Sequence, residues 1–369
     1  MTGPIASALL VVASFAAVVA LLARCAGLND RGPWVATITY GGAYGRAVEE
    51  AVLVPFAGQT GLRVEVDGFG GGLAQIRAQV DAGRVFWDVV DVETAEAVRG
   101  CEEGLFEWVA IADMLPAPDG TSAADDFKVE QQTQCAIPGV SFSTAVAYNE
   151  DLFPGEKPGT IHDFFDLEKF PGRRGMRRAP EANLEFAIMG DGVSRAEVYN
   201  VLGTEEGLQR AFDKLSSIKD HIVWWEAGAQ PPQMLADREV AMSTAYNGRI
   251  FNAQVLENQP FSIVWDGQIV DQAQMAIVAG TPRLDAARRL LRFFTSTEAQ
   301  AGIAGRIAYG PARLSSDALV STHLATGVEM APHLPTYPAN LEKALQTDAR
   351  WWSARRDDLH ERFSTWLIR

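Results

Sequence analysis

The chain has 369 residues, of which 47% are hydrophobic and 21% are charged. This composition excludes a disordered or collagen-like chain, and the length allows two or three domains with their own cores. The 32 Lys and Arg residues stand against 47 Asp and Glu residues, a formal net charge of -15 that argues against nucleic-acid and anionic-lipid partners. Such a charge suits a cationic ligand, although surface acid more often serves solubility.

Residues 5–23 form one apolar run, which is interrupted by two serines and ends at Arg24. Residues 1–30 are therefore predicted to be a secretory signal peptide or an uncleaved membrane anchor. Leu22-Ala23-Arg24-Cys25 resembles a bacterial lipobox, but Arg24 stands where a small residue is expected, so a lipidated Cys25 is a third possibility. No later segment approaches 18 apolar residues, so the protein is expected to be exported and periplasmic, with membrane attachment only through this segment.

From residue 35 onwards, short apolar runs alternate with amphipathic stretches, which is typical of β/α units. Two glycine-rich stretches, 41–45 and 68–72, are predicted to be loops between a strand and a helix, and 112–126 is predicted to be a surface loop. The predicted strands of this half are 35–40, 62–66 and 86–92, and the predicted helices are 46–56, 73–80 and 95–103.

Cys101 and Cys135 remain as an even pair once Cys25 is set aside. Because the chain is expected in an oxidising compartment, a disulfide between them is predicted. It would close a loop of about 35 residues and stabilise the fold by roughly 3–4 kcal/mol. The alternative is a pair of buried free thiols.

The chain changes character after Asn149, where a turn-rich stretch covers 153–171. The whole chain is nevertheless predicted to be an α/β protein of two lobes. Ligands of open α/β sheets bind outside the carboxyl ends of strands, so the loops after strands are the candidate binding segments. Helices are predicted at 184–189, 205–219, 233–236, 283–294 and 352–367, and strands at 222–225, 239–246, 263–265 and 275–278.

Enzyme motifs are absent from the sequence. The glycine run at 68–72 follows a strand, but the third glycine of a dinucleotide fingerprint falls on Leu73, and no phosphate-binding Gly-Lys-Ser/Thr occurs. The five histidines lack metal-ligand spacing, and no G-x-S-x-G elbow is present. We therefore predict no catalytic residue, no metal and no cofactor. An exported hydrolase or transferase that uses paired carboxylates stays as the alternative, because their separation cannot be deduced from sequence.

An ordered set of segments extends over about residues 34–367. It resembles the substrate-binding proteins of bacterial ABC importers, specifically the spermidine/putrescine-binding family. The segments are Tyr40-Gly41-Gly42-Ala43-Tyr44, Pro55-Phe56, Thr60-Gly61-Leu62-Arg63-Val64, Trp87-Asp88-Val89-Val90-Asp91, Cys135 to Asn149, Trp224-Trp225-Glu226-Ala227-Gly228-Ala229-Gln230-Pro231 and Ala245-Tyr246-Asn247-Gly248-Arg249.

The resemblance implies the two-lobed periplasmic-binding-protein fold of type II-like topology. Each lobe is then a mixed sheet flanked by helices, and the ligand lies in the cleft between the lobes. Lobe 1 is expected to comprise 34–145 and about 271–312, and lobe 2 to comprise 146–270 and about 313–369.

The same resemblance implies that the protein is the periplasmic solute-binding component of an ABC importer. It is expected to be a monomer that captures a small amine-containing or zwitterionic solute, either a polyamine or an amino-acid-like or opine-like compound. A permease and its ATPase are the expected partners that receive the solute. The mechanism is then closure of the lobes around the ligand, which shifts an open–closed equilibrium.

Candidate ligand contacts in the first half follow predicted strands. Tyr40, Gly41 and Tyr44 lie in the first strand-to-helix loop, where glycines allow backbone amides to approach a ligand; the alternative is an ordinary loop with a buried tyrosine. Asp91 ends a strand and either accepts hydrogen bonds from an ammonium group or caps the next helix. Two hydroxyl residues, Ser143 and Thr144, lie near the first expected crossing between lobes.

In the second half, the resemblance places an acid, Glu185, and a cleft aromatic, Tyr246, near the amine of the ligand. Gln230 precedes two prolines at a helix start, where backbone donors converge. Polyamine binders carry a tryptophan and an acid where this chain has Asp271 and Ala273, and Arg249 adds a positive charge that suits a carboxylate. Arg249 and Asp271 therefore favour a zwitterion over a diamine, unless they pair with each other.

Overall fold

The computed structural model describes residues 32–369. The predictions about the signal peptide, the membrane anchor and Cys25 fall outside these residues. Within the described range, no helix combines the length and the apolar character needed to cross a membrane.

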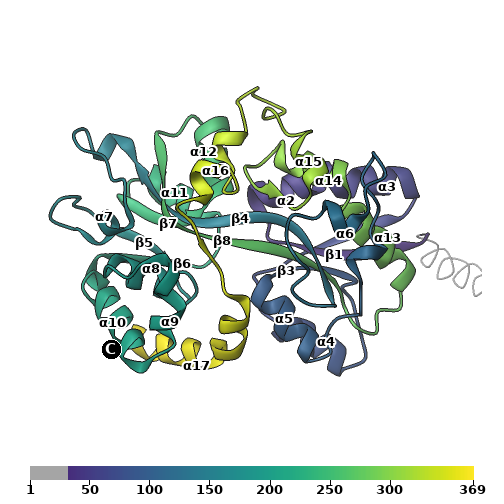
Figure 1. Cartoon of the computed structure of the whole chain (residues 1–369), viewed down its shortest axis with the longest axis horizontal. Coiled ribbons are helices and arrows are strands. Elements are labelled where there is room, and N and C mark those ends of the chain that lie inside the picture. Colours follow the sequence, from purple (N-terminus) through teal and green to yellow (C-terminus); the bar gives the residue numbers. More distant parts are fainter. Residues whose placement is uncertain (1–31) are drawn as a thin grey trace, which may run out of the picture.

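The strands form one mixed sheet that runs through both lobes, in the order β2-β1-β3-β8-β4-β7-β5-β6 (Figure 1). Two short strands complete it, because β10 pairs with β8 and β9 pairs with β4. The bounds are β1 Trp34–Thr39, β2 Arg63–Gly68, β3 Val89–Glu93, β4 Ala136–Asn149, β5 Arg174–Arg177, β6 Ile222–Trp225, β7 Met242–Tyr246, β8 Phe261–Ile277, β9 Gly310–Pro311 and β10 Leu345–Gln346.

Two long strands, β4 and β8, connect the lobes. They pair antiparallel from Ala136↔Ala276 to Asn149↔Phe261, so one hydrogen-bonded ribbon passes from the first lobe into the second. The register shifts twice, between Pro138 and Ser141 and between Thr144 and Val146. The predicted lobe boundaries at 145/146 and 270/271 fall inside this ribbon and stay predictions.

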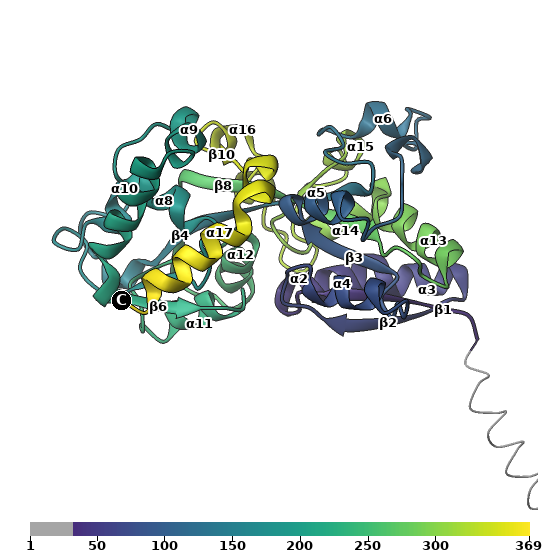
Figure 2. The same ribbon diagram turned by 90° about the horizontal axis from the view of Figure 1, so that it is seen from below.

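Helices cover the sheet in two groups, one for each lobe, and each group encloses its own apolar clusters (Figures 1 and 2). Around the first lobe lie α2 Gly42–Val48, α3 Val54–Thr60, α4 Ala74–Asp81, α5 Thr94–Glu102, α6 Ala123–Asp126, α13 Leu284–Phe294, α14 Thr297–Ala304 and α15 Leu314–Asp317. Around the second lie α7 Ile161–Phe165, α8 Asn183–Gly190, α9 Val198–Leu202, α10 Glu205–Ser216, α11 Gln230–Ala236, α12 Asn247–Leu256, α16 Pro338–Leu341 and α17 Ala349–Leu367.

The C-terminal helix α17 illustrates how the sequence sets the packing. Its first turn is capped by Asp348, whose carboxylate accepts the N–H of Trp351 at 2.9 Å. Trp352, Leu359 and Phe363 recur at helical spacing and are buried in the core of the second lobe, as predicted for 352–367. Figure 2 shows α17 crossing the second lobe and meeting α5 of the first.

Two sequence predictions about elements are wrong. The strands predicted at 263–265 and 275–278 are parts of one strand, β8, because pairing with both β3 and β4 accommodates the polar residues between them. The loop predicted at 41–45 is mostly helix, since Gly41 adopts φ 60° and the helix begins directly at Gly42. Gly41 supplies the left-handed backbone that turns the chain from β1 into α2.

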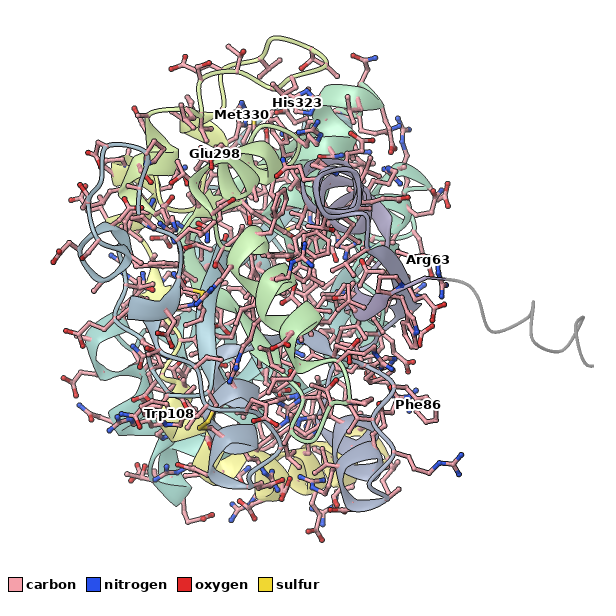
Figure 3. All side chains as sticks on the ribbon, turned by 90° about the vertical axis from the view of Figure 1, so that its right-hand side faces the viewer. Arg63, Phe86, Trp108, Glu298, His323 and Met330 are labelled. Carbon is pink, nitrogen blue, oxygen red and sulfur yellow. A yellow bond between two sulfur atoms is a disulfide. The ribbon has the colours of Figure 1, made fainter. Side chains whose placement is uncertain are left out.

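Exposed aromatic side chains on the end of the first lobe do not gather into one apolar patch. Phe86 and Trp108 are 60% and 64% exposed, and they lie on opposite sides of that face (Figure 3).

The predicted disulfide is present. Cys101 in α5 bonds to Cys135 just before β4, with their Cα atoms 5.6 Å apart. The bond therefore fastens α5 to the base of the interlobe ribbon.

Replacing both cysteines by serine is expected to lower the free energy of unfolding by about 3–4 kcal/mol, because the bond closes a loop in the unfolded chain. Chemical denaturation of the oxidised protein and the double variant measures the difference. Reduced wild type serves as the control and should match the variant. An unchanged denaturation midpoint in the variant would contradict a stabilising role.

Candidate ligand-binding site

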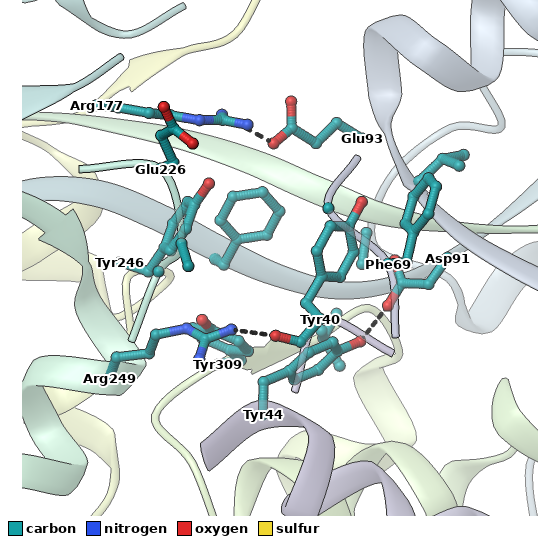
Figure 4. Close-up of a pocket in the computed structure, with 17 residues that line it drawn as sticks. Tyr40, Tyr44, Phe69, Asp91, Glu93, Arg177, Glu226, Tyr246, Arg249 and Tyr309 are labelled. Carbon is teal, nitrogen blue, oxygen red and sulfur yellow. Dashed lines mark hydrogen bonds and ion pairs between the residues drawn. The ribbon is translucent and has the colours of Figure 1, made fainter. Parts of the chain in front are cut away.

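A cavity of about 350 Å³ lies between the two lobes, at the ends of strands from both (Figure 4). Its size falls at the small end of ligand pockets, which fits a small solute. The first lobe and the ribbon contribute Tyr40, Tyr44, Phe69, Gly70, Asp91, Val92, Glu93, Val140, Phe142, Ala273 and Tyr309, and the second lobe contributes Arg177, Glu226, Ala227, Gly228, Tyr246 and Arg249.

Arg249 places a positive charge in the cavity that no carboxylate neutralises. The residue lies in the first turn of α12, in the second lobe, and is only 6% exposed. It donates from Nη2 to the carbonyl of Tyr40 at 3.2 Å and from Nη1 to that of Gly41 at 3.3 Å. Among residues 32–369, no Asp or Glu lies within ion-pair distance of it. A buried guanidinium that meets two carbonyls and the Tyr309 hydroxyl but no carboxylate favours an anionic ligand group.

The alternative pairing of Arg249 with Asp271 is wrong. Asp271 accepts a hydrogen bond from the Thr94 hydroxyl at 2.7 Å and another from the backbone N–H of Gln272 at 2.7 Å. It lies on β8, outside the residues that line the main cavity.

Asp91 is the corresponding buried negative charge. It lies in the middle of β3, is 4% exposed, and accepts a hydrogen bond from the Tyr44 hydroxyl at 2.5 Å. The N-cap of α5 is Glu93, so the alternative that Asp91 caps this helix is wrong. Burial raises the pKa of Asp91 to about 7, and the nearby carboxylates of Glu96 and Glu93 act in the same direction. In the part of the chain that the structure describes, no Lys or Arg forms an ion pair with Asp91. An ammonium group on a ligand would stabilise its ionised form.

A second pair of charges spans the cavity between the lobes. Nη1 of Arg177, at the end of β5, lies 3.3 Å from Oε1 of Glu93, at the end of β3 (Figure 4). Glu226 lies on the rim, with its side chain 74% exposed and 3.5 Å from Arg178. These two acids therefore already have cationic partners.

Aromatic rings form the apolar walls between these charges. Tyr40 packs against Phe69 with 5.5 Å between ring centroids, Phe142 packs against Tyr246 at 5.7 Å, and Tyr309 lies beside Arg249. Such faces suit methylene groups and also attract cations.

Gln230 shapes the cavity without lining it. Its side-chain carbonyl accepts the N–H groups of Glu226 and Ala227, both at 2.7 Å, and so fixes the loop that ends in Gly228. A Cβ on Gly228 would lie 2.7 Å from Cδ2 of Tyr246 and 2.9 Å from Nε of Arg249. The close approach of this loop to both side chains therefore requires glycine.

Gly228→Ala is expected to displace Tyr246 and Arg249 and to weaken ligand binding about tenfold or more, with little change in Tm because the loop is not in the core. Gly155→Ala, at a glycine with free space around it, is the matched control. Equal affinities of the two variants in calorimetric titrations would contradict the role of this loop.

A second, smaller cavity of about 40 Å³ lies beside the first and shares Glu93, Phe142, Arg177 and Tyr246 with it. Glu185 faces it and accepts hydrogen bonds from Nε1 of Trp352 at 2.6 Å and from the Tyr199 hydroxyl at 3.2 Å. Burial raises the pKa of Glu185 and that of Asp271 to about 7. Thr144, Glu185 and Asp271 line this cavity and not the main one.

The structure thus brings five of the eleven predicted contacts into the main cavity, and their role in binding stays a prediction. Ser143 is buried in β4, where its N–H donates to the Asn247 side chain at 3.0 Å. Gly41 faces Arg249 through its carbonyl alone. The five cavity residues are Tyr40, Tyr44, Asp91, Tyr246 and Arg249.

Sequence reasoning missed several cavity residues. Glu93 directly follows the predicted strand 86–92 and Gly228 follows the predicted strand 222–225, so a position after a strand was their signal. Arg177 had no such signal, because the four-residue strand β5 was not predicted. Phe69, Phe142 and Tyr309 gave no chemical sign of a role in the cleft.

Comparison with known proteins identifies the class that this fold and cleft define. Residues 51–336 match the family described as bacterial extracellular solute-binding proteins, and the chain belongs to that family. It is 39% identical to the gamma-aminobutyric acid-binding protein of Pseudomonas aeruginosa over 348 residues, which cover 94% of this chain and 95% of that protein. A solved ABC transporter substrate-binding protein from Bradyrhizobium japonicum is 32% identical, with a TM-score of 0.78 over 91% of this chain and 99% of that one.

Two further relatives, one solved with a ligand and one without, superpose on this chain to different extents. MotA from A. tumefaciens, solved with glucopine, is 26% identical and superposes with a TM-score of 0.81 over 91% of this chain and all of that one. AttC from Agrobacterium tumefaciens, solved open and unliganded, is also 26% identical, but its TM-score is 0.63 over 92% of this chain and all of that one. In this structure, Arg249 and Arg177 of the second lobe each contact residues of the first lobe across the cavity.

The protein is therefore the solute-binding component of an ABC importer, with the two-lobed fold that the sequence predicted. The alternative of a carboxylate-dependent hydrolase or transferase finds no support in these comparisons.

Proposed function

We propose that the protein captures 4-aminobutyrate in the periplasm, as a monomer, and delivers it to a permease and its ATPase. The observation that carries this proposal is the pair of buried, uncompensated charges, Arg249 and Asp91, which line one small cavity from facing lobes. A zwitterion with its two charges separated by methylene groups complements both. The 39% identity to a gamma-aminobutyric acid-binding protein supports the same ligand.

In the proposed complex, each part of the ligand has a partner of matching chemistry. The carboxylate pairs with the guanidinium of Arg249, beside Tyr309, and the ammonium group pairs with Asp91, beside the ring of Tyr40. The methylene groups lie against Phe142. Because the partners belong to different lobes, one ligand bridges the cleft and stabilises closure.

A polyamine fits this arrangement less well. It would present a second ammonium group to Arg249, and two like charges at close range repel each other in a buried site. Thr144, Glu185 and Asp271 remain proposed contacts only for a ligand long enough to enter the second cavity, as an opine would be.

Calorimetric titration with 4-aminobutyrate, putrescine and succinate tests the proposal, because putrescine lacks the carboxylate and succinate lacks the ammonium group. We expect 4-aminobutyrate to bind at least about 100-fold more tightly than either. Tighter binding of putrescine than of 4-aminobutyrate would contradict the proposal of a zwitterionic ligand and would favour a polyamine. No binding of any of the three would contradict the proposed solute class.

A further inference from the structure

A buried network of charges links α17 to the wall of the main cavity. Arg356 in α17 lies one turn after Trp352 on the same face of the helix, and its side chain is 19% exposed. Its Nη1 lies 3.1 Å from Oε1 of Glu96, and its Nε lies 3.4 Å from Oε1 of Glu181. Glu96 belongs to α5 of the first lobe, so this ion pair crosses from one lobe to the other.

Glu96 in turn holds two segments of the cavity wall. Its side chain is 2% exposed, and Oε1 accepts the N–H of Gly72 at 2.7 Å while Oε2 accepts the N–H of Glu93 at 3.2 Å. Glu93 lines the cavity, and Gly72 ends the loop that brings Phe69 into it. Among the described residues, Arg356 is the only cation within ion-pair distance of Glu96.

A second interlobe pair lies next to the first. Arg99, one turn after Glu96 in α5, donates from both Nη atoms to the carboxylate of Asp357, at 2.7 and 2.8 Å. The Asp357 side chain is 78% exposed, so solvent screens this pair and its contribution is small. The buried pair of Arg356 with Glu96 carries most of the coupling between α17 and α5.

We propose that Arg356 is a positioning residue for ligand capture. When the lobes meet, it pairs with Glu96 and thereby fastens α17 to α5, stabilises the closed arrangement and fixes the carboxylate that orients the amides of Gly72 and Glu93. Arg356 lines the second cavity and not the main one, so it does not touch a ligand that is held in the main cavity. The ligand in this scheme rests on the proposed function.

The charges around Glu96 determine how the ion pair between Arg356 and Glu96 responds to pH. Burial and the charge of Glu93 raise the pKa of Glu96, and the charge of Arg356 opposes this effect. Arg177, Glu181 and His360 belong to the same network, and Asp91, Asp271 and Tyr40 are further titratable groups near Glu96. Without Arg356, Glu96 takes up a proton at higher pH and presents a weaker acceptor to Gly72 and Glu93.

The test compares Arg356→Gln and Arg356→Lys with Arg362→Gln. Arg362 lies on the same helix but pairs with Glu205 and Asp358, both in the second lobe, so it is a matched control. We expect Arg356→Gln to bind 4-aminobutyrate about tenfold more weakly, mainly through faster dissociation in stopped-flow experiments, and to lose more affinity at pH 6 than at pH 8. Arg356→Lys should recover part of the loss, and Arg362→Gln should behave as wild type.

A structural role alone predicts a lower Tm for Arg356→Gln with unchanged affinity and dissociation rate, and that result would overturn the proposal. If wild type does not bind 4-aminobutyrate, the proposed ligand is wrong. Small-angle scattering of the unliganded proteins then tests whether the pair of Arg356 and Glu96 holds the lobes together. The unliganded Arg356→Gln protein should have a larger radius of gyration than Arg362→Gln. Equal radii of gyration would contradict the proposed role of Arg356 in holding the lobes together, whatever the ligand is.

Discussion

Replacing Arg249 by Gln is expected to weaken the binding of 4-aminobutyrate by about 100-fold or more. Truncating one partner of a buried, hydrogen-bonded charge pair costs about 2–5 kcal/mol, and Arg249 is the cavity cation that no carboxylate neutralises. The variant should also lose its discrimination against putrescine, because the repulsion of the second ammonium group disappears.

Calorimetric titrations of both solutes measure the two effects in parallel. Arg210→Gln is the control, since Arg210 lies on the surface of the second lobe and pairs with Asp191 at 2.7 Å. If Arg249→Gln kept the affinity for 4-aminobutyrate within about threefold of wild type, the carboxylate site would be elsewhere.

Asp91→Asn is expected to abolish binding and, at the same time, to stabilise the unliganded protein above neutral pH. Asp91 has a pKa of about 7 in the folded protein against 3.8 for an ordinary aspartate, so its contribution to stability is present below about pH 4 and is lost as pH rises through 7. Asparagine removes this penalty and still accepts the Tyr44 hydroxyl. A gain of about 1 kcal/mol or more corresponds to roughly 2–4 °C in Tm.

Melting curves at pH 5 and pH 8, without ligand, test the stability half of this prediction. The gain should be larger at pH 8 than at pH 5, and it should vanish only below about pH 4. Asp271→Asn is the comparison, because burial raises its pKa to about 7 as well, yet it lies outside the main cavity. We expect a similar gain in Tm without loss of 4-aminobutyrate binding. A tenfold loss would show that the ligand reaches the second cavity.

The same carboxyl makes binding depend on pH in the wild type. The ammonium group of the ligand pairs with ionised Asp91, so affinity should rise about tenfold between pH 6 and pH 8 and level off above that. Binding near pH 7 should also release protons, which titrations in buffers of different ionisation enthalpy detect. An affinity that does not change over this range would exclude Asp91 as the partner of the ammonium group.

The course of the chain explains which parts of the site were predictable. Tyr40 follows β1, Tyr246 ends β7 and Asp91 lies two residues before the end of β3. The edge where strands end is a place that open α/β sheets use for ligands. Arg249 follows one turn later in α12 and carries a charge that has no apparent use in a core. Residues with such signals can be predicted from a single sequence.

Residues that reach the cavity from elsewhere could not be recognised. Tyr309 comes from the return of the chain after α14, and only the folded ribbon brings it beside Arg249. Arg177 ends a strand of four residues whose arginines conceal any apolar pattern. Asp271 was predicted to be a cleft residue from its position in the resemblance. It shares a face of β8 with Ala273, but it lies two residues further from the main cavity, which Ala273 lines, and it lines the second cavity.

The two register shifts in the ribbon of β4 and β8 have a mechanical consequence. A bulge bends a strand and increases its local twist while the ladder on either side stays intact. The shifts at Pro138/Ser141 and Thr144/Val146 enclose Phe142, whose ring forms part of the cavity wall. The ribbon that connects the lobes and the wall of the cavity therefore share the same few peptide units, so any bending of the ribbon moves the cavity wall.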